Sequence, residues 1–146
     1  MQTSSPAELP DDVGFLLAKA SQRFNERLVG AFARRGYPEV RSSFGSVLVP
    51  LFQAGDQRIG DLGRRSALSK QTMTALVRDC EAAGLVERRR DPDDGRAFQI
   101  GLTTRGRRFQ AVAAEVREEL EAELAAALGD RRLETLIDAL KGVITP

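Results

Sequence analysis

The chain of 146 residues is 42% hydrophobic and 29% charged, a composition that favours one folded domain, or a small module with an oligomerisation element, over a disordered chain. A single cysteine excludes an internal disulfide. Because the chain also has no histidine, few metal ligands remain, so we expect no metal site and no cofactor. No apolar run approaches the roughly 20 residues that span a bilayer, and residues 1–10 lack the apolar region of a signal peptide, so we expect a cytoplasmic protein without a membrane partner.

The net charge of +1 conceals an uneven distribution of charge along the chain. Residues 58–108 carry 12 basic and 7 acidic side chains, whereas the remainder carries 10 basic and 14 acidic ones. This asymmetry is expected of a protein in which one part faces phosphate and the other packs elsewhere.

The N-terminal part of the chain predicts two helices after a flexible segment at residues 1–10. Pro10 and Asp11 open a long amphipathic helix, which Gly36 and Pro38 end. Its apolar residues recur at steps of three and four, namely Phe15, Leu16, Ala20, Phe24, Leu28, Ala31 and Phe32. A second helix is expected over residues 42–53, with Pro50 as an irregularity near its end.

Residues 59–106 predict two short helices followed by a basic hairpin. The first helix is expected to stop near Ala67 and the second to start at Ser69. Residues 91–95, Asp-Pro-Asp-Asp-Gly, combine a fixed φ, side chains that cap turn amides and a glycine, so a turn is expected there. After it, Phe98, Ile100 and Leu102 alternate as in a strand with one buried face. The predicted fold is therefore mainly α with a small β-hairpin wing, in the order of a winged helix-turn-helix.

The C-terminal part predicts two more helices. Thr103 is expected to cap a long helix that Gly129 ends, and Asp130 to cap a last helix that ends near Val143. The apolar stripes of the terminal helices are too large to be buried on a small winged lobe. We therefore expect residues 11–36 and 103–146 to form a helical dimerisation region and residues 41–102 a winged helix-turn-helix DNA-binding domain. The alternative is that these stripes make only core within one chain.

The stretch from Leu68 to Gly106 carries a pattern that is more specific than any of its parts. The residues are Leu68, Ser69, Lys70, Gln71, Thr72, Met73, Thr74, Leu76, Val77, Glu81, Ala82, Gly84, Leu85, Val86, Glu87, Arg88, Asp91, Pro92, Asp94, Gly95, Arg96, Ala97, Leu102, Thr103 and Gly106. In this order and spacing, the chain resembles the MarR family of bacterial transcriptional regulators over nearly its full length. The resemblance implies a homodimer whose terminal helices intertwine and whose two winged lobes bind one pseudo-palindromic site. It also implies a repressor that a small ligand or cysteine oxidation releases from DNA.

The helix after Ser69 is expected to enter the major groove of double-stranded DNA. Ser69 as the N-cap leaves backbone amides and the positive end of the helix dipole facing a phosphate. The expected contacts are Ser69, Lys70, Gln71, Thr72, Thr74 and Arg78, whereas Met73, Leu76, Val77 and Cys80 face inward. Gln71 is the main candidate for base reading, because its amide can pair with adenine, which contributes about 1–3 kcal/mol of discrimination. The alternative for Ser69, Lys70 and Thr72 is a cap and a solvated turn.

Three positions depart from the family pattern. Position 75, commonly basic in relatives, is Ala75, and the charge appears instead at Arg78, so we expect a different operator. Gly63 and Ser66 replace better helix formers or apolar residues in the supporting helix, and glycine within a helix costs roughly 1 kcal/mol relative to alanine. We therefore expect the supporting helix to be short or mobile.

In the hairpin, the expected DNA contacts are Arg88, Arg90, Asp94 and Arg96. Arg96 is expected to reach the minor groove, with the Asp94 carboxylate holding its guanidinium extended. Arg88, Arg89 and Arg90 are expected to add phosphate contacts, although strand alternation turns at least one of them away. The alternative is that these charges form only a solvated face.

The effector site is expected between the dimer helices and the winged lobe, where the family has its ligand cleft. The expected pocket residues are Phe15, Phe24, Tyr37, Phe44, Leu48 and Phe52, although such stripes at helical spacing also form ordinary core. Cys80 is expected to be a buried structural thiol rather than a redox sensor, because it faces inward and the chain has no histidine or second cysteine.

The predicted function is that of a sequence-specific DNA-binding repressor that acts as a homodimer and responds to a small-molecule effector. An enzyme is not expected, because Gly55, Gly60 and Gly63 form no phosphate-binding fingerprint. The alternative is a winged-helix protein–protein interaction module without a DNA target of its own.

Overall fold

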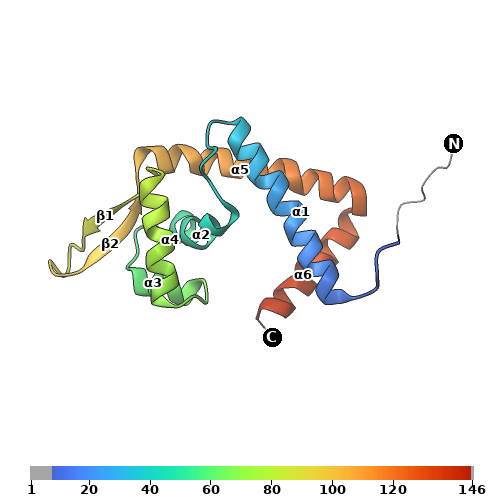
Figure 1. Cartoon of the computed structure of the whole chain (residues 1–146), viewed down its shortest axis with the longest axis horizontal. Coiled ribbons are helices and arrows are strands. Elements are labelled where there is room, and N and C mark those ends of the chain that lie inside the picture. The colour runs from blue at the N-terminus through green and yellow to red at the C-terminus, as the bar shows by residue number, and fades with distance from the viewer. Residues whose placement is uncertain (1–7, 146) are drawn as a thin grey trace.

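The computed structural model describes residues 8–145 as a mainly helical protein with one two-stranded hairpin, which confirms the predicted fold class (Figure 1). The elements are α1 (Val13–Arg34), the 3-10 turn η1 (Ser42–Phe44), α2 (Gly45–Ala54), α3 (Ile59–Arg65), α4 (Lys70–Ala82), β1 (Val86–Arg90), β2 (Phe98–Leu102), α5 (Thr104–Leu128) and α6 (Asp130–Ile144). Residues 1–7 of the expected flexible N-terminus lie outside the described residues. In Figure 1, α5 runs along the molecule and joins a lobe of α2, α3, α4 and the hairpin to α1 and α6.

Side-chain caps begin three of the helices. Asp12 Oδ1 accepts a hydrogen bond from the Phe15 amide at 2.8 Å, so α1 starts slightly later than expected. The predicted caps Ser69 and Thr103 are confirmed: their hydroxyl oxygens accept from the amides three residues on, at 3.1 and 3.0 Å. These bonds satisfy donors that a helix leaves free in its first turn.

The junction between α5 and α6 differs from expectation in one residue. Gly129 ends α5 as predicted, with a φ of 83° that favours glycine. The same glycine also occupies the N-cap position of α6, and Asp130 is the first residue of that helix, with no capping bond from its side chain. The predicted capping role of Asp130 is therefore wrong, because Gly129 is both the last cap of α5 and the first cap of α6.

The helix expected over residues 42–53 is divided into η1 and α2. Pro50 lies inside α2 and has no amide hydrogen to donate to the carbonyl of Ser46, four residues earlier. The Ser66 hydroxyl donates to that carbonyl oxygen instead, at 2.6 Å. Ser66, which departs from the family pattern, therefore compensates for the proline on the neighbouring helix.

The turn between α3 and α4 explains the glycine that the sequence places in α3. That helix has only 7 residues, so it is short as expected, and Gly63 is buried within it. A Cβ on Gly63 would lie 3.1 Å from the Leu68 carbonyl oxygen, and the Leu68 amide donates to Gly63 at 2.9 Å. Glycine thus lets the chain fold back closely, through a left-handed Ala67 with a φ of 53°.

The hairpin pairs β1 and β2 antiparallel, from Val86 opposite Leu102 to Arg90 opposite Phe98. Gln57 adds a short bridge to Ile100, with backbone hydrogen bonds of 3.1 and 2.7 Å. Ile100 is fully buried, but Phe98, expected on the same buried face, is 50% exposed. The expectation for Phe98 is wrong because the hairpin extends beyond the core of the lobe, which leaves this ring uncovered.

The core runs from the base of α1 into the lobe without interruption. Phe109 of α5 lies at its centre, with ring centroids 4.8 Å from Phe32 and 4.9 Å from Tyr37. Within the described residues, α6 has no buried side chain, and its exposed apolar residues are Leu136, Ile137, Leu140, Val143 and Ile144.

Cys80 should be unreactive in the folded protein. Its side chain is fully buried, and burial together with the neighbouring Asp79 charge raises the pKa of the thiol to about 12. At pH 8 its thiolate is then roughly a thousandfold less populated than that of an ordinary cysteine. Titration with Ellman's reagent should give no fast reaction in native buffer and one thiol per chain in guanidinium chloride. Fast reaction of the native protein would contradict the structural role.

No helix within residues 8–145 is long and apolar enough to cross a membrane. The same residues contain no group of three or more cysteine, histidine, aspartate or glutamate side chains placed to hold a metal ion.

Candidate nucleic-acid interface

The N-terminal end of α4 presents free polar groups to solvent. Ser69, Lys70, Gln71 and Thr72 are all exposed, and the Ser69 hydroxyl lies 2.9 Å from that of Thr72. The cap satisfies the Thr72 amide only, so the remaining first-turn amides and the positive end of the helix dipole stay available to an anion.

One side of α4 is buried and the opposite side is open. Met73, Val77 and Cys80 are fully buried, as expected, while the exposed side carries Gln71 and Arg78 at a separation of seven residues. Thr74 is only half exposed, and its hydroxyl donates to the Lys70 carbonyl at 2.8 Å. Its donor is therefore occupied by the helix itself, which leaves its oxygen as an acceptor and its methyl group for contact with a ligand.

The tip of the hairpin is built from two aspartates that bind backbone amides. Asp91 Oδ1 accepts from the Asp93 amide at 2.9 Å, and Asp94 Oδ1 accepts from the Arg96 amide at 3.0 Å. The sequence predicted a bond between the Asp94 carboxylate and the Arg96 guanidinium. In the structure, Asp94 instead binds the backbone amide of Arg96. The Arg96 side chain is exposed and takes part in no hydrogen bond or ion pair recorded within residues 8–145.

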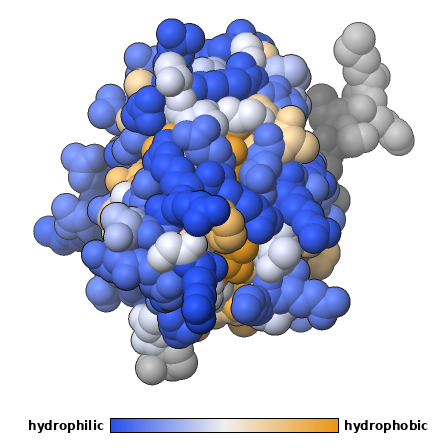
Figure 2. All heavy atoms as spheres, turned by 90° about the vertical axis from the view of Figure 1, so that its left-hand side faces the viewer, coloured by the Kyte–Doolittle hydropathy of each residue, from blue (hydrophilic) through white to orange (hydrophobic). Residues whose placement is uncertain are grey.

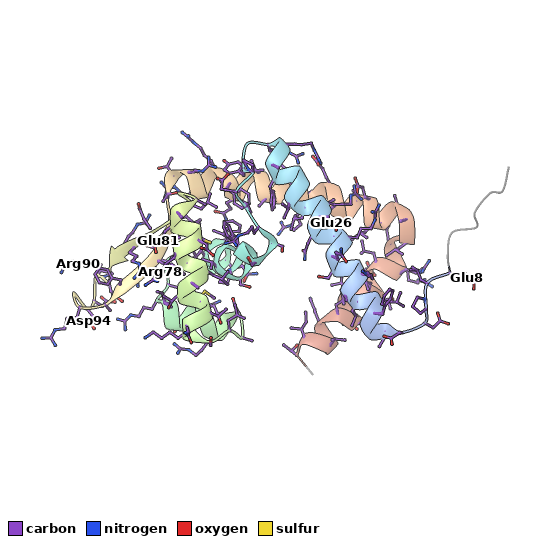
Figure 3. The ribbon with its side chains drawn as sticks, in the orientation of Figure 1. Glu8, Glu26, Arg78, Glu81, Arg90 and Asp94 are labelled. Atoms are coloured by element: carbon purple, nitrogen blue, oxygen red, sulfur yellow. The ribbon has the colours of Figure 1, made fainter. Side chains whose placement is uncertain are left out.

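The three consecutive arginines of β1 have different surroundings. Arg89 points away from the others and binds the Asp56 carboxylate at 2.9 Å, so it is the arginine that strand alternation turns aside. Arg88 binds Glu81 of α4 at 3.1 Å, and Arg90 donates to the Gly95 carbonyl at the tip, at 3.2 Å. Figure 3 shows Arg90 and Asp94 at the outer end of the hairpin, with Arg78 and Glu81 on α4 next to it.

A buried carboxylate holds the hairpin on the lobe, and sequence reasoning missed this role. Asp91 is only 5% exposed, and Arg58, the residue before α3, donates to Asp91 Oδ2 at 2.8 Å through both Nε and Nη2. The Asp93 amide and the Arg58 guanidinium lower the pKa of the Asp91 carboxyl. The sequence indicated Asp91 as a turn residue, but no local signal marks Arg58 as its partner, 33 positions away.

Asp91→Asn should loosen the hairpin and lower the thermal midpoint of unfolding at neutral pH. Because the folded-state pKa of Asp91 is lowered, its contribution is present above the ordinary aspartate range and is lost as pH falls through the folded value. The difference in midpoint between wild type and variant should therefore shrink below about pH 4. Thermal scans by circular dichroism from acidic to neutral pH, with the exposed Asp93→Asn as the matched control, measure this. A difference that stays constant with pH would contradict the role of the charge.

A cavity of about 520 Å³ lies between α1, α2 and α5. Four of the six expected pocket residues, Phe24, Phe44, Leu48 and Phe52, contribute to its lining. Phe15 does not, because it lies near the start of α1, where it is 40% exposed. Tyr37 does not line it either, because its ring is buried against Phe109 and beneath the Arg105 guanidinium, 4.6 Å from the ring centroid.

The wing end of the molecule is predominantly hydrophilic. Figure 2 looks onto this end and shows mostly polar side chains with a narrow apolar strip between them. In Figure 1, the free end of the hairpin and the N-terminal end of α4 both lie at the lower left. The arrangement can therefore offer helix amides, an amide side chain and arginines to one extended polyanion.

Comparison with known proteins gives a match to one family model and to several HTH-type transcriptional regulators. The family model described as MarR family matches residues 53–97. The HTH-type transcriptional repressor YetL of Bacillus subtilis is 35% identical over 89 residues, which cover 60% of this chain and 52% of that protein. The chain thus spans about half the length of the relatives it matches in sequence.

Solved structures match over nearly the whole chain. A probable transcriptional regulator from Pseudomonas aeruginosa is 28% identical, with a TM-score of 0.78 over 91% of this chain and 97% of that one. CouR from Rhodococcus jostii RHA1, solved bound to p-coumaroyl-CoA, is 25% identical, with a TM-score of 0.75 over 97% of each chain. The order of helices and the hairpin is therefore shared with these proteins over most of the chain.

Proposed function

Because the chain belongs to the MarR family, we propose that it is a sequence-specific transcriptional regulator that binds double-stranded DNA as a homodimer. The observation that carries this proposal is the shared orientation of two anion-binding features, the open N-terminus of α4 and the arginine-bearing hairpin, at one end of the molecule. The Arg88–Glu81 and Arg58–Asp91 pairs support it, because they hold the hairpin in place against α4 and α3.

In the proposed complex, α4 enters the major groove with its N-terminus first. Ser69, Lys70 and Thr72 lie near phosphates, where the free amides of the first turn add to the positive charge. Gln71 pairs with the edge of an adenine, and Thr74 offers its methyl group and oxygen to a neighbouring base. Arg78, seven residues after Gln71 on the open side of the helix, contacts the DNA backbone.

The hairpin acts as a wing beside the same duplex. Arg96 inserts into the minor groove, where a narrow A·T segment has a strongly negative potential. Asp94 keeps the backbone of the tip in the conformation that projects Arg96. Arg88 and Arg90 bind phosphates, for which they would exchange or extend their present contacts with Glu81 and Gly95.

The proposed dimer forms through the helical region of residues 11–36 and 103–146, and residues 41–102 form the DNA-binding unit. Support comes from the apolar side chains that α1 and α6 leave exposed, among them Phe15 and Leu17 on α1 and Ile137 and Leu140 on α6. Two copies would then place their α4 helices about one helical turn of DNA apart, roughly 34–36 Å between half-site centres.

The cavity between α1, α2 and α5 is the proposed effector site, and the protein is proposed to act as a repressor that the effector releases from DNA. Its lining is mainly aromatic and aliphatic with a few polar groups, as is typical of small-molecule sites. CouR, a structural neighbour, is described as bound to p-coumaroyl-CoA. The cavity lies between the helices proposed for dimerisation and the lobe proposed for DNA binding, so a ligand there can change how the two are arranged.

Selection of bound fragments from a genomic DNA library tests the proposal. We expect enrichment of a pseudo-palindromic sequence whose half-sites are one helical turn apart, and a dimer by sedimentation velocity at micromolar concentration. Recovery of unenriched fragments only, or a monomer that binds no duplex, would contradict the proposal and favour a protein–protein interaction module.

A further inference from the structure

Two hollows in the surface share the same arginine. The effector cavity and a second, smaller hollow of about 460 Å³ at the end of α4 are both lined by Arg41 and Phe44. Arg41 belongs to the connector between α1 and α2, immediately before η1. Its side chain can therefore face a molecule in the cavity on one side and the helix α4 on the other.

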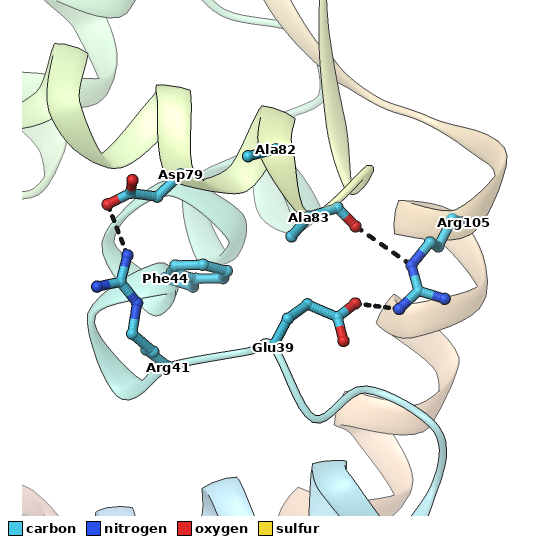
Figure 4. Close-up of a pocket in the computed structure, with 7 residues that line it drawn as sticks. All are labelled: Glu39, Arg41, Phe44, Asp79, Ala82, Ala83 and Arg105. Atoms are coloured by element: carbon cyan, nitrogen blue, oxygen red, sulfur yellow. Dashed lines mark hydrogen bonds and ion pairs between the residues drawn. The ribbon is translucent and has the colours of Figure 1, made fainter.

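In the structure, Arg41 is bound to α4. Its Nη2 donates to Asp79 Oδ2 at 2.6 Å, and its guanidinium lies 5.2 Å from the centroid of the Phe44 ring (Figure 4). The side chains of Arg41 and Asp79 are 59% and 47% exposed. Exposed ion pairs of this kind shift an equilibrium by only about two- to fivefold. Arg41 can therefore leave Asp79 for another anionic partner with little loss of binding free energy.

The connector is held at a second point that does not depend on Arg41. Glu39 forms an ion pair with Arg105 of α5, and Arg105 Nε donates to the Ala83 carbonyl, directly after α4, at 3.3 Å (Figure 4). The connector thus stays fixed to α5 while the Arg41 side chain changes its partner. Loss of the Arg41–Asp79 pair removes one link between α4 and the connector, while Arg105 still joins Glu39 of the connector to Ala83 at the end of α4.

The cavity has the chemistry to attract Arg41. Its apolar surface is formed by phenylalanine rings and aliphatic side chains, and its charged lining residues are the cations Arg41 and Arg117 and one carboxylate, Glu121. An apolar molecule with one anionic group would bury its body against these apolar side chains and place the anion beside Arg41, at the edge of the cavity. A charge-assisted bond is stronger in such a partly enclosed site than on an open surface.

We infer that Arg41 is a two-position switch: it binds either Asp79 of α4 or the anionic group of an apolar ligand in the cavity. The inference rests on the proposed effector site and specifies both its ligand, an apolar monoanion, and the contact through which that ligand reaches α4. Ligand binding and the Arg41–Asp79 pair are then mutually exclusive, so each weakens the other by the same factor.

The test compares an anionic and a neutral probe of similar shape, anilinonaphthalene sulfonate and N-phenyl-naphthylamine, by fluorescence titration in the absence of DNA. Asp79→Asn frees Arg41, so we expect it to tighten the sulfonate by about two- to fivefold and to leave the neutral probe unchanged. Arg41→Gln should weaken the sulfonate only, and the double variant should behave as Arg41→Gln does. Asp61→Asn, which removes an exposed carboxylate paired with Arg64 on α3, is the matched control and should change neither probe.

Equal changes for both probes, or no change in Asp79→Asn, would overturn the switch. Ala114→Phe places a ring in the cavity and should weaken binding of both probes, so sulfonate binding that it leaves unchanged would also overturn the assignment. Because no DNA is present, these results are independent of the fragment selection. In a second experiment the sulfonate should lower the affinity of wild type for a selected duplex and have less effect on Asp79→Asn. An equal effect on both proteins would contradict the link to α4.

Discussion

Replacing Gly106 with alanine should destabilise the protein by about 3 kcal/mol or more, the largest effect that we expect from a single methyl group. Gly106 lies in the first turn of α5, where the end of the lobe crosses the helix. A Cβ there would approach the Leu85 carbonyl oxygen closer than the 3.0 Å that real Cβ atoms respect. That oxygen belongs to the backbone and already accepts from the Thr103 amide at 3.0 Å, so it cannot move aside cheaply.

Urea denaturation followed by circular dichroism measures this loss. Gly45→Ala is the matched control, because a Cβ on Gly45 meets no atom within 4 Å and its φ of −56° is helical. This control should be neutral or stabilise by up to about 1 kcal/mol. Equal stability of Gly106→Ala and wild type would show that α5 and the lobe are not packed as described.

The second large effect concerns DNA recognition and divides it between two residues. Gln71→Ala should reduce discrimination at one position of each half-site by about 1–3 kcal/mol, or roughly 5- to 150-fold, because a bidentate amide contact is removed. Arg96→Ala should instead lower affinity for all duplexes, since the potential of the minor groove depends on its width more than on the identity of each base. Competition titrations with a selected operator and its single-base variants separate the two results.

A matched control removes an arginine that is not part of the proposed DNA surface. Arg34→Ala at the end of α1 changes the net charge by the same amount as Arg96→Ala and, in a preparation that sedimentation velocity shows to be dimeric, should leave operator affinity close to wild type. If Arg96→Ala binds like this control, the wing assignment is wrong. If Gln71→Ala keeps full discrimination, base reading belongs to another residue of α4.

Local signals were sufficient to predict most of the elements. Ser69 and Thr103 cap their helices through bonds to amides only three residues away, and Gly129 ends α5 through its own backbone conformation. The residues around Asp94 likewise fold into a turn through bonds within the turn itself. Such interactions depend on residues that are adjacent in sequence, so the pattern of side chains predicts them.

The contacts that join distant segments could not be predicted in this way. Arg58 and Asp91 are 33 positions apart, and Arg41 and Asp79 are 38 positions apart, so nothing in the neighbourhood of either arginine indicates its partner. The close approach at Gly106 depends equally on where the lobe crosses α5. These contacts fix the hairpin and α4 relative to the rest of the molecule, which is why local sequence patterns could not predict how these elements are arranged.

Two residues that departed from the family pattern have a structural explanation. Ser66 supplies the donor that Pro50 lacks, and Gly63 leaves room for the Leu68 carbonyl. Each is unfavourable as a helix residue but favourable in this particular packing. Helix propensity alone predicted a short or mobile supporting helix, and α3 is short, but propensity does not include the neighbour that each of these residues meets.

The most direct test of the central claim, that α4 and the hairpin form one surface for duplex DNA, is the salt dependence of binding. A protein that neutralises six to ten phosphates should lose about 10³- to 10⁵-fold affinity between about 50 and 200 mM salt. We expect a loss of this order for wild type on a selected duplex by fluorescence anisotropy, and a shallower dependence for Arg96→Ala. Absence of duplex binding at the lower salt concentration, or an affinity that salt does not change, would contradict the account.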